Sequence, residues 1–153
     1  MIVGLAGCGA SKGSTAAPSG ARFSKAEVLQ RGDAICVRRQ RQGRRNKPPA
    51  SLNNPSAGQL KRIGPFLQRA AAAGSNALAK LRALGPPKTD REGFDIAIST
   101  GQQFAADEAA AARAAMSGDL PAYNRALTNL NGSAVATQTA TAGFGFKHCG
   151  QGR

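Results

Sequence analysis

The sequence lacks tryptophan entirely and contains one histidine and eight carboxylates among its 153 residues. A single histidine, His148, excludes metal sites that are built from several imidazoles. No run approaches the roughly 18 to 20 consecutive apolar residues that span a bilayer, which excludes a transmembrane helix. The spacing of the few carboxylates indicates no acid–base pair. We therefore expect no enzymatic activity, no cofactor and no metal.

Cations, by contrast, are abundant, and their distribution along the chain is uneven. The net charge is +13, and residues 22–82 contain 14 lysines or arginines against only Glu27 and Asp33. In residues 83–153 the two signs cancel. A basic half beside a neutral half indicates attraction to an anion, which can be nucleic acid, a lipid headgroup layer or an anionic wall polymer.

The densest basic run falls within ten residues near the end of the first predicted helix. Its six cations are Arg38, Arg39, Arg41, Arg44, Arg45 and Lys47. The run contains no aromatic residue on which the bases of a single strand stack. Three interpretations stay open: a solvated helix end, a contact with anionic lipid or wall polymer, and a nucleic-acid contact.

The N-terminal stretch ends in Leu5-Ala6-Gly7-Cys8, which resembles the bacterial lipobox with its acylated cysteine. Residues 9–22 are rich in glycine, serine and alanine, as is typical of a flexible tether about 20 Å long. A signal peptide needs a positive region and about 7 to 15 apolar residues before that cysteine. Since only seven residues precede Cys8, either the true start lies upstream of Met1 or the lipobox is a chance match, and we favour the upstream start.

A glycine-rich start also invites comparison with a nucleotide-binding loop, but the spacing does not fit. The phosphate loop requires G-x-x-x-x-G-K-[ST], whereas Lys12 here precedes Gly13. Helix breakers follow at Pro18 and Gly20, and no later strands supply a sheet. We therefore favour lipidation at Cys8, and with it an extracytoplasmic protein anchored to the cell membrane.

Periodic apolar residues predict four helices with short connections in residues 23–150. Ser24 and Glu27 form a capping box at the first, and Thr89 and Glu92 one at the third. We expect the second helix to end at Gly85, with a kink or a reset start at Pro65. Met116 should lie on the apolar face of the third helix. The fourth helix should start near Asp119, and a non-helical segment from Gly143 should fold back onto the bundle. Short connections favour an up-down four-helix bundle.

Acylation of Cys8 would leave one pair of cysteines, Cys36 and Cys149. We expect these two to form a disulfide, because the first and last helices of such a bundle lie adjacent. In an oxidising compartment that bond would persist. The alternative is that both are reduced and buried in a cytosolic protein.

Three short motifs resemble a broad group of small exported actinobacterial helical proteins. They are Gly-Asp-Ala-Ile-Cys at 32–36, Leu-Gly-Pro-Pro at 84–87 and Ala-Gly-Phe-Gly-Phe-Lys-His-Cys-Gly at 142–150. The resemblance implies a secreted or lipoprotein class and a pairing of the two cysteines, and it transfers no catalytic residue. The resulting expectation is a non-enzymatic envelope lipoprotein. The alternative is a cytosolic basic helical protein that binds nucleic acid.

Overall fold

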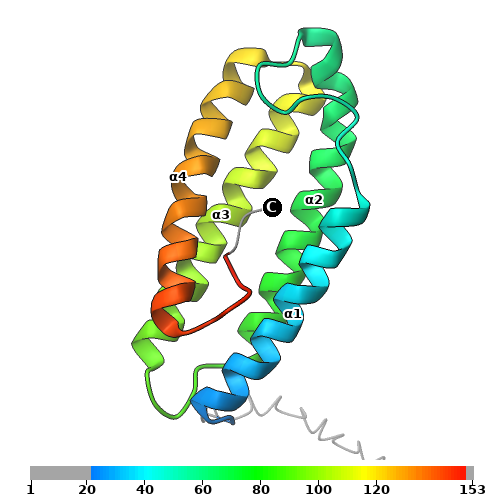
Figure 1. The fold of residues 1–153 in the computed structure, drawn as a ribbon. Coiled ribbons are helices and arrows are strands. Elements are labelled where there is room, and N and C mark those ends of the chain that lie inside the picture. The colour runs from blue at the N-terminus through cyan, green and yellow to red at the C-terminus, as the bar shows by residue number, and fades with distance from the viewer. Residues whose placement is uncertain (1–21, 151–153) are drawn as a thin grey trace, which may run out of the picture.

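The computed structural model describes residues 22–150, which form four α-helices and contain no strand. The helices are α1 (Lys25–Arg45), α2 (Ala57–Leu84), α3 (Arg91–Ser117) and α4 (Leu120–Phe144). Each packs on the next in the chain (Figure 1), and the α2–α3 and α3–α4 interfaces are more extensive than the α1–α2 interface. The predicted all-helical class is confirmed, while the up-down order stays a prediction. Cys8 and the predicted tether up to residue 21 lie outside the described residues.

Two of the helices begin with capping boxes. In α1 the predicted box is confirmed, because the Ser24 amide donates to Glu27 at 2.8 Å and the Glu27 amide donates back to the Ser24 hydroxyl. These hydrogen bonds favour the charged carboxylate and lower the pKa of Glu27. In α2 an equivalent box joins Ser56 and Gln59. Pro65 therefore lies inside α2, so of the two alternatives the reset helix start is wrong, and a kink at Pro65 stays a prediction.

The boundaries of α3 and α4 correct two further expectations. The N-cap of α3 is Asp90 rather than Thr89, and its carboxylate accepts from the Gly93 amide at 3.2 Å. Lys25 donates to the same carboxylate at 2.7 Å, which lowers the pKa of Asp90 and ties the start of α1 to the start of α3. The last helix begins after Asp119 as predicted, but it continues through the first glycine of the C-terminal motif as far as Phe144.

Two clusters of buried side chains form the core. The first lies between α2, α3 and α4, and it includes Leu60, Ile63, Phe66 and Tyr123. Tyr123 is fully buried, its hydroxyl donates to the Leu52 carbonyl at 3.0 Å, and burial raises its pKa. The second cluster joins the first half of α1 to α3 and the C-terminus through Val28, Cys36, Phe94, Phe144, Phe146 and Cys149. The prediction of Met116 on the apolar face of α3 is wrong, since it is 49% exposed.

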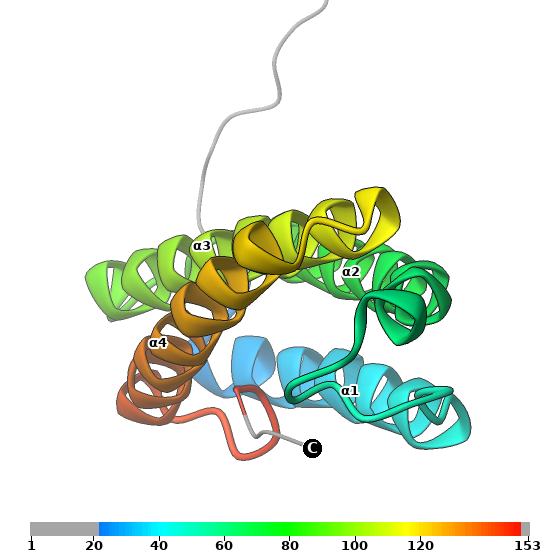
Figure 2. The ribbon, with the colours of Figure 1, turned by 90° about the horizontal axis from the view of Figure 1, so that it is seen from above.

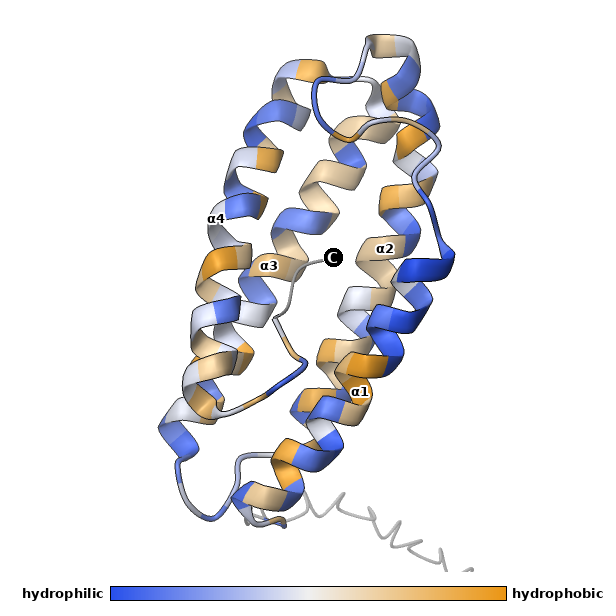
Figure 3. Cartoon of the chain, in the orientation of Figure 1, coloured by the Kyte–Doolittle hydropathy of each residue, from blue (hydrophilic) through white to orange (hydrophobic). Residues whose placement is uncertain are grey.

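The first helix is held to the bundle along only part of its length. Seen from above, the C-terminal segment, residues 145–150, lies between α4 and α1 (Figure 2). Hydropathy changes along α1 from mixed in its first half to strongly hydrophilic in its second (Figure 3). None of the described helices has the length and apolar character needed to cross a membrane.

Candidate anion-binding surface

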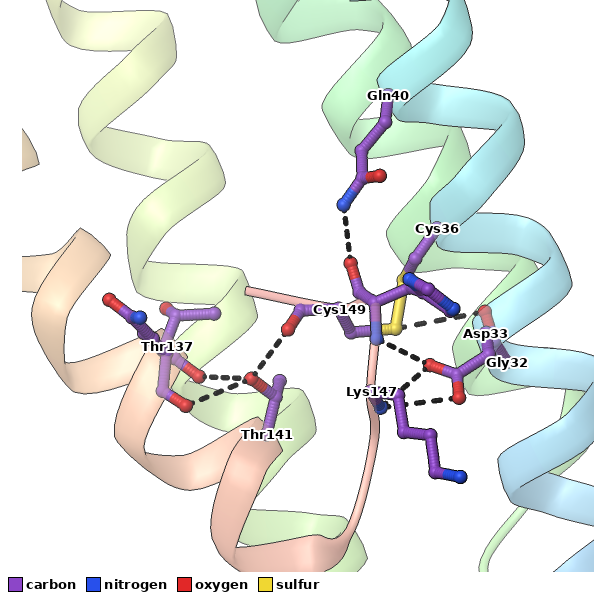
Figure 4. Close-up of a disulfide and its surroundings, with 10 residues drawn as sticks. Gly32, Asp33, Cys36, Gln40, Thr137, Thr141, Lys147 and Cys149 are labelled. Carbon is purple, nitrogen blue, oxygen red and sulfur yellow. Dashed lines mark hydrogen bonds between the residues drawn. A yellow bond between two sulfur atoms is a disulfide. The ribbon is translucent and has the colours of Figure 1, made fainter. Parts of the chain in front are cut away.

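The C-terminal segment positions α1 through a disulfide and a set of hydrogen bonds (Figure 4). Cys36 and Cys149 are bonded at a Cα–Cα distance of 5.1 Å, which confirms the predicted pair. Asp33 lies three residues before Cys36 in α1. Its carboxylate accepts from the Lys147 amide at 3.0 Å and from the His148 amide at 2.9 Å. Hydrogen bonds from backbone amides to a charged carboxylate are stronger than those between neutral groups, so they fix this turn against α1.

Two further hydrogen bonds complete the attachment of this segment. Gln40 donates to the His148 carbonyl at 2.7 Å, and the Thr141 hydroxyl donates to the Cys149 carbonyl at 3.1 Å. Gly32 is required at its position because a Cβ there would overlap the Phe146 ring. The motifs at 32–36 and 142–150 therefore contact each other in the folded chain.

One of the six cations of the basic run, Arg39, reaches from α1 across α2 to α3. Its guanidinium lies 3.3 Å from Glu108 and 5.6 Å from the centre of the Phe104 ring. The Glu108 side chain is 7% exposed and that of Arg39 is 32% exposed. Gly74 of α2 leaves the space for this pair, because a Cβ there would lie 2.8 Å from Glu108 Oε2 and 3.1 Å from Arg39 Nη2. Arg39 thus balances a buried carboxylate.

The other five predicted cations, Arg38, Arg41, Arg44, Arg45 and Lys47, are all exposed. Among the described residues, none of them forms an ion pair. Arg44 and Arg45 lie in the last turn of α1, where the helix dipole favours positive charge. That effect accounts for their position but leaves their charge facing solvent.

Sequence reasoning missed two cations of α2, Arg69 and Lys80, that lie across from the basic end of α1. Both line a cavity between the two helices together with Arg38 and Arg39. The available signal was that α2 contains no aspartate or glutamate. A cation on such a helix has no carboxylate partner at the three- and four-residue spacings that neutralise charge on other helices.

Two buried carboxylates of α3 lie apart from the basic run in the sequence. Asp107 and Glu108 are consecutive yet both buried, at 8% and 5% exposure, and Asp107 accepts from Gln103 at 3.0 Å. Every buried polar side-chain atom in the described part of the chain has a hydrogen-bond partner. Within residues 22–150, no three His, Cys, Asp or Glu side chains gather as a metal site would require.

What the geometry supplies is thus a cationic surface on α1 and α2, held in place by the disulfide and by the Arg39–Glu108 pair. The chain matches no protein-family model, no curated protein and no solved structure.

Proposed function

We propose that this protein is a non-enzymatic, extracytoplasmic protein, tethered to the membrane through Cys8, whose α1–α2 surface binds anionic phospholipid headgroups. The observation that carries the proposal is the set of exposed cations at the end of α1 and just after it, which form no ion pair with any other described residue. They lie in a stretch from Ala34 to Thr89 that contains no carboxylate. The charges of this stretch are therefore all positive, which favours the approach of an anion.

The spacing of the cations suits contact with an extended surface. Arg38, Arg41 and Arg45 follow one another three and four residues apart, so they lie along one face of α1. Each lysine or arginine near an anionic membrane contributes about 1 kcal/mol. The five exposed cations of the run therefore supply several kcal/mol, enough for reversible binding beside a lipid anchor.

The Cys36–Cys149 disulfide supports the extracytoplasmic part of the proposal, because disulfides persist in oxidising compartments and are rare in the cytosol. It also weakens the case for a cytosolic nucleic-acid-binding protein, which would need both cysteines reduced. Binding to nucleic acid is kept as an outcome of the experiment below.

The test is co-sedimentation of the full chain with vesicles of phosphatidylglycerol or of phosphatidylcholine at two salt concentrations. The triple variant Arg38→Gln, Arg41→Gln, Arg45→Gln should bind phosphatidylglycerol vesicles at least tenfold more weakly. A matched control removes three exposed arginines from the other half of the chain, through Arg91→Gln, Arg113→Gln and Arg125→Gln. This control should change binding less than twofold.

Two results would overturn the lipid contact. One is an equal loss of binding in both triple variants, because any charge would then suffice. The other is tighter binding to duplex DNA than to phosphatidylglycerol vesicles at the same salt concentration, which would favour the nucleic-acid alternative.

The anchor is tested separately from the surface. The native protein should partition with membranes and carry an acyl mass, and Cys8→Ser should release it to the soluble fraction. Intact-mass measurement without reductant detects the acyl group and the disulfide together. A native protein with no added mass, found in the soluble fraction, would contradict the tether.

A further inference from the structure

The interface between α1 and α2 is closed in one half and open in the other. In the first half of α1, Ile35 is buried, and Gly32 approaches the Leu81 side chain. Beyond Ile35, the residues that face α2 at three- and four-residue steps are Arg39 and Gln42 of α1 and Asn46, the C-cap of that helix. Polar side chains thus occupy positions where a helix interface normally has large apolar ones.

The facing positions of α2 are small. Ala70, Ala73 and Ala77 line the interface opposite the polar positions of α1, and Phe66 provides the only ring. Apart from Phe66 and Ile35, the residues that line the interface are small or polar, so it is left unfilled, although protein interiors are normally close-packed. This departure from regular packing is the kind that marks a binding site.

Two adjoining cavities, of about 350 and 390 Å³, occupy the unfilled interface, which we call the basic cleft. These volumes lie at the lower end of the roughly 300 to 1,000 Å³ typical of small-molecule sites. The cavities share Arg39, Gln42, Arg69 and Ala73. The first adds Gln40, Gly43, Arg44, Asn46, Phe66 and Ala70, and the second adds Ile35, Arg38, Ala72, Asn76, Ala77 and Lys80.

The charges around the basic cleft are positive and largely unbalanced. No aspartate or glutamate lines either cavity. Arg39 is paired with Glu108, but Arg69, which lines both cavities, forms no ion pair in the described part of the chain, and neither does Arg44. Guanidinium groups present a planar fork of donors that matches the oxygens of a phosphate.

From this combination we propose that the basic cleft binds one molecule of an amphipathic phosphate monoester. The phosphate would lie against Arg69 and Arg44, and a short apolar chain would cover Phe66, Ala70 and Ala73. A free inorganic anion would leave the apolar floor uncovered, and a neutral amphiphile would leave the arginines without a partner. This site goes beyond the proposed membrane contact, since it needs neither Cys8 nor a bilayer.

The probe is octyl phosphate, titrated calorimetrically into the full chain below the concentration at which it forms micelles. Inorganic phosphate and octyl glucoside serve as the two partial ligands. We expect one molecule of octyl phosphate per chain, bound at least tenfold more tightly than either partial ligand. Affinity for inorganic phosphate equal to that for octyl phosphate would overturn the proposal, because the apolar floor would then contribute nothing.

Two variants test the position of the site. Arg69→Gln should weaken octyl phosphate binding about tenfold, the loss expected for one charge-assisted contact. Arg62→Gln is the matched control, because it removes the same charge from an exposed position of α2 that lines neither cavity. Ala73→Leu adds apolar bulk to the wall that both cavities share, without changing charge, and should also weaken binding. Equal losses in Arg62→Gln and Arg69→Gln, or no loss in Ala73→Leu at unchanged helix content, would refute the site.

Discussion

Removing the disulfide should lower the unfolding free energy by an amount that follows from the length of its loop. Cys36 and Cys149 are separated by 113 residues, so the bond closes nearly the whole described domain. In the chain-entropy model a loop of this length restricts the unfolded ensemble by about 4–5 kcal/mol. We expect the double variant Cys36→Ala, Cys149→Ala to lose about that amount.

The double variant should nonetheless still fold. The C-terminal segment keeps the hydrogen bonds from its backbone amides to Asp33 and from Gln40 to the His148 carbonyl, and the Phe146 ring stays over Gly32. Since the native contacts survive, the loss of stability comes mainly from the greater conformational freedom of the unfolded state without the disulfide. For a domain of this size the melting temperature should fall by about 15 °C.

Urea unfolding followed by circular dichroism measures this difference, with the oxidised chain and the double variant compared in the same buffer. Reductant should destabilise the parent chain to the level of the variant and leave the variant unchanged. A decrease in unfolding free energy below about 1 kcal/mol would refute the reasoning, because the disulfide would then restrict the unfolded ensemble very little. A changed dependence on urea concentration would point instead to altered compactness of the unfolded state.

Two other predictions concern α2 and the helix starts. Gly74→Ala should stabilise less than helix propensity alone predicts, because the ends of the Glu108 and Arg39 side chains must move to accommodate the new Cβ. Gly132→Ala, whose Cβ would meet nothing within 4 Å, should stabilise by up to about 1 kcal/mol, and a similar gain at Gly74 in chemical denaturation would contradict the ion-pair argument. Glu27 and Asp90 have lowered pKa values, so the stability they contribute is present above their ordinary values of 4.5 and 3.8 and is lost as pH falls through the lower folded values. Unfolding curves between pH 6 and pH 2 should show this loss, and an unchanged slope in Glu27→Gln, Asp90→Asn would contradict it.

Helix existence and most helix ends were predictable because their causes are local. The Ser24 cap, Pro121 in the first turn of α4 and the glycine breaks at Gly85 and Gly118 act over three or four residues. The errors at Thr89 and Pro65 arose where a competing local signal stood close by. Asp90 is the better-placed cap, and Ser56 with Gln59 starts α2 about one turn before the apolar pattern begins at Leu60.

The candidate site was only partly predictable. The basic run could be predicted from residues 38–47, but which of its cations are paired could not. Arg39 has an ion-pair partner 69 residues away, whereas Arg41 has none within residues 22–150. Arg69 joined the site only because α1 and α2 pack side by side. Nothing in the local sequence distinguishes a cation that lines a cavity from one that faces solvent.

The amino-acid sequence by itself determined the four helices, the pair of cysteines that remains once Cys8 is set aside, and the excess of positive charge in the first half of the chain. Only the tertiary structure decided that Arg39 balances a buried carboxylate, that Asp33 binds the C-terminal segment and that the α1–α2 interface stays open. The reason is the sequence distance over which each feature is determined. Helix caps, breaks and charge runs depend on residues a turn apart, whereas ion pairs and cavities depend on which helices meet, and packing of the whole chain determines that.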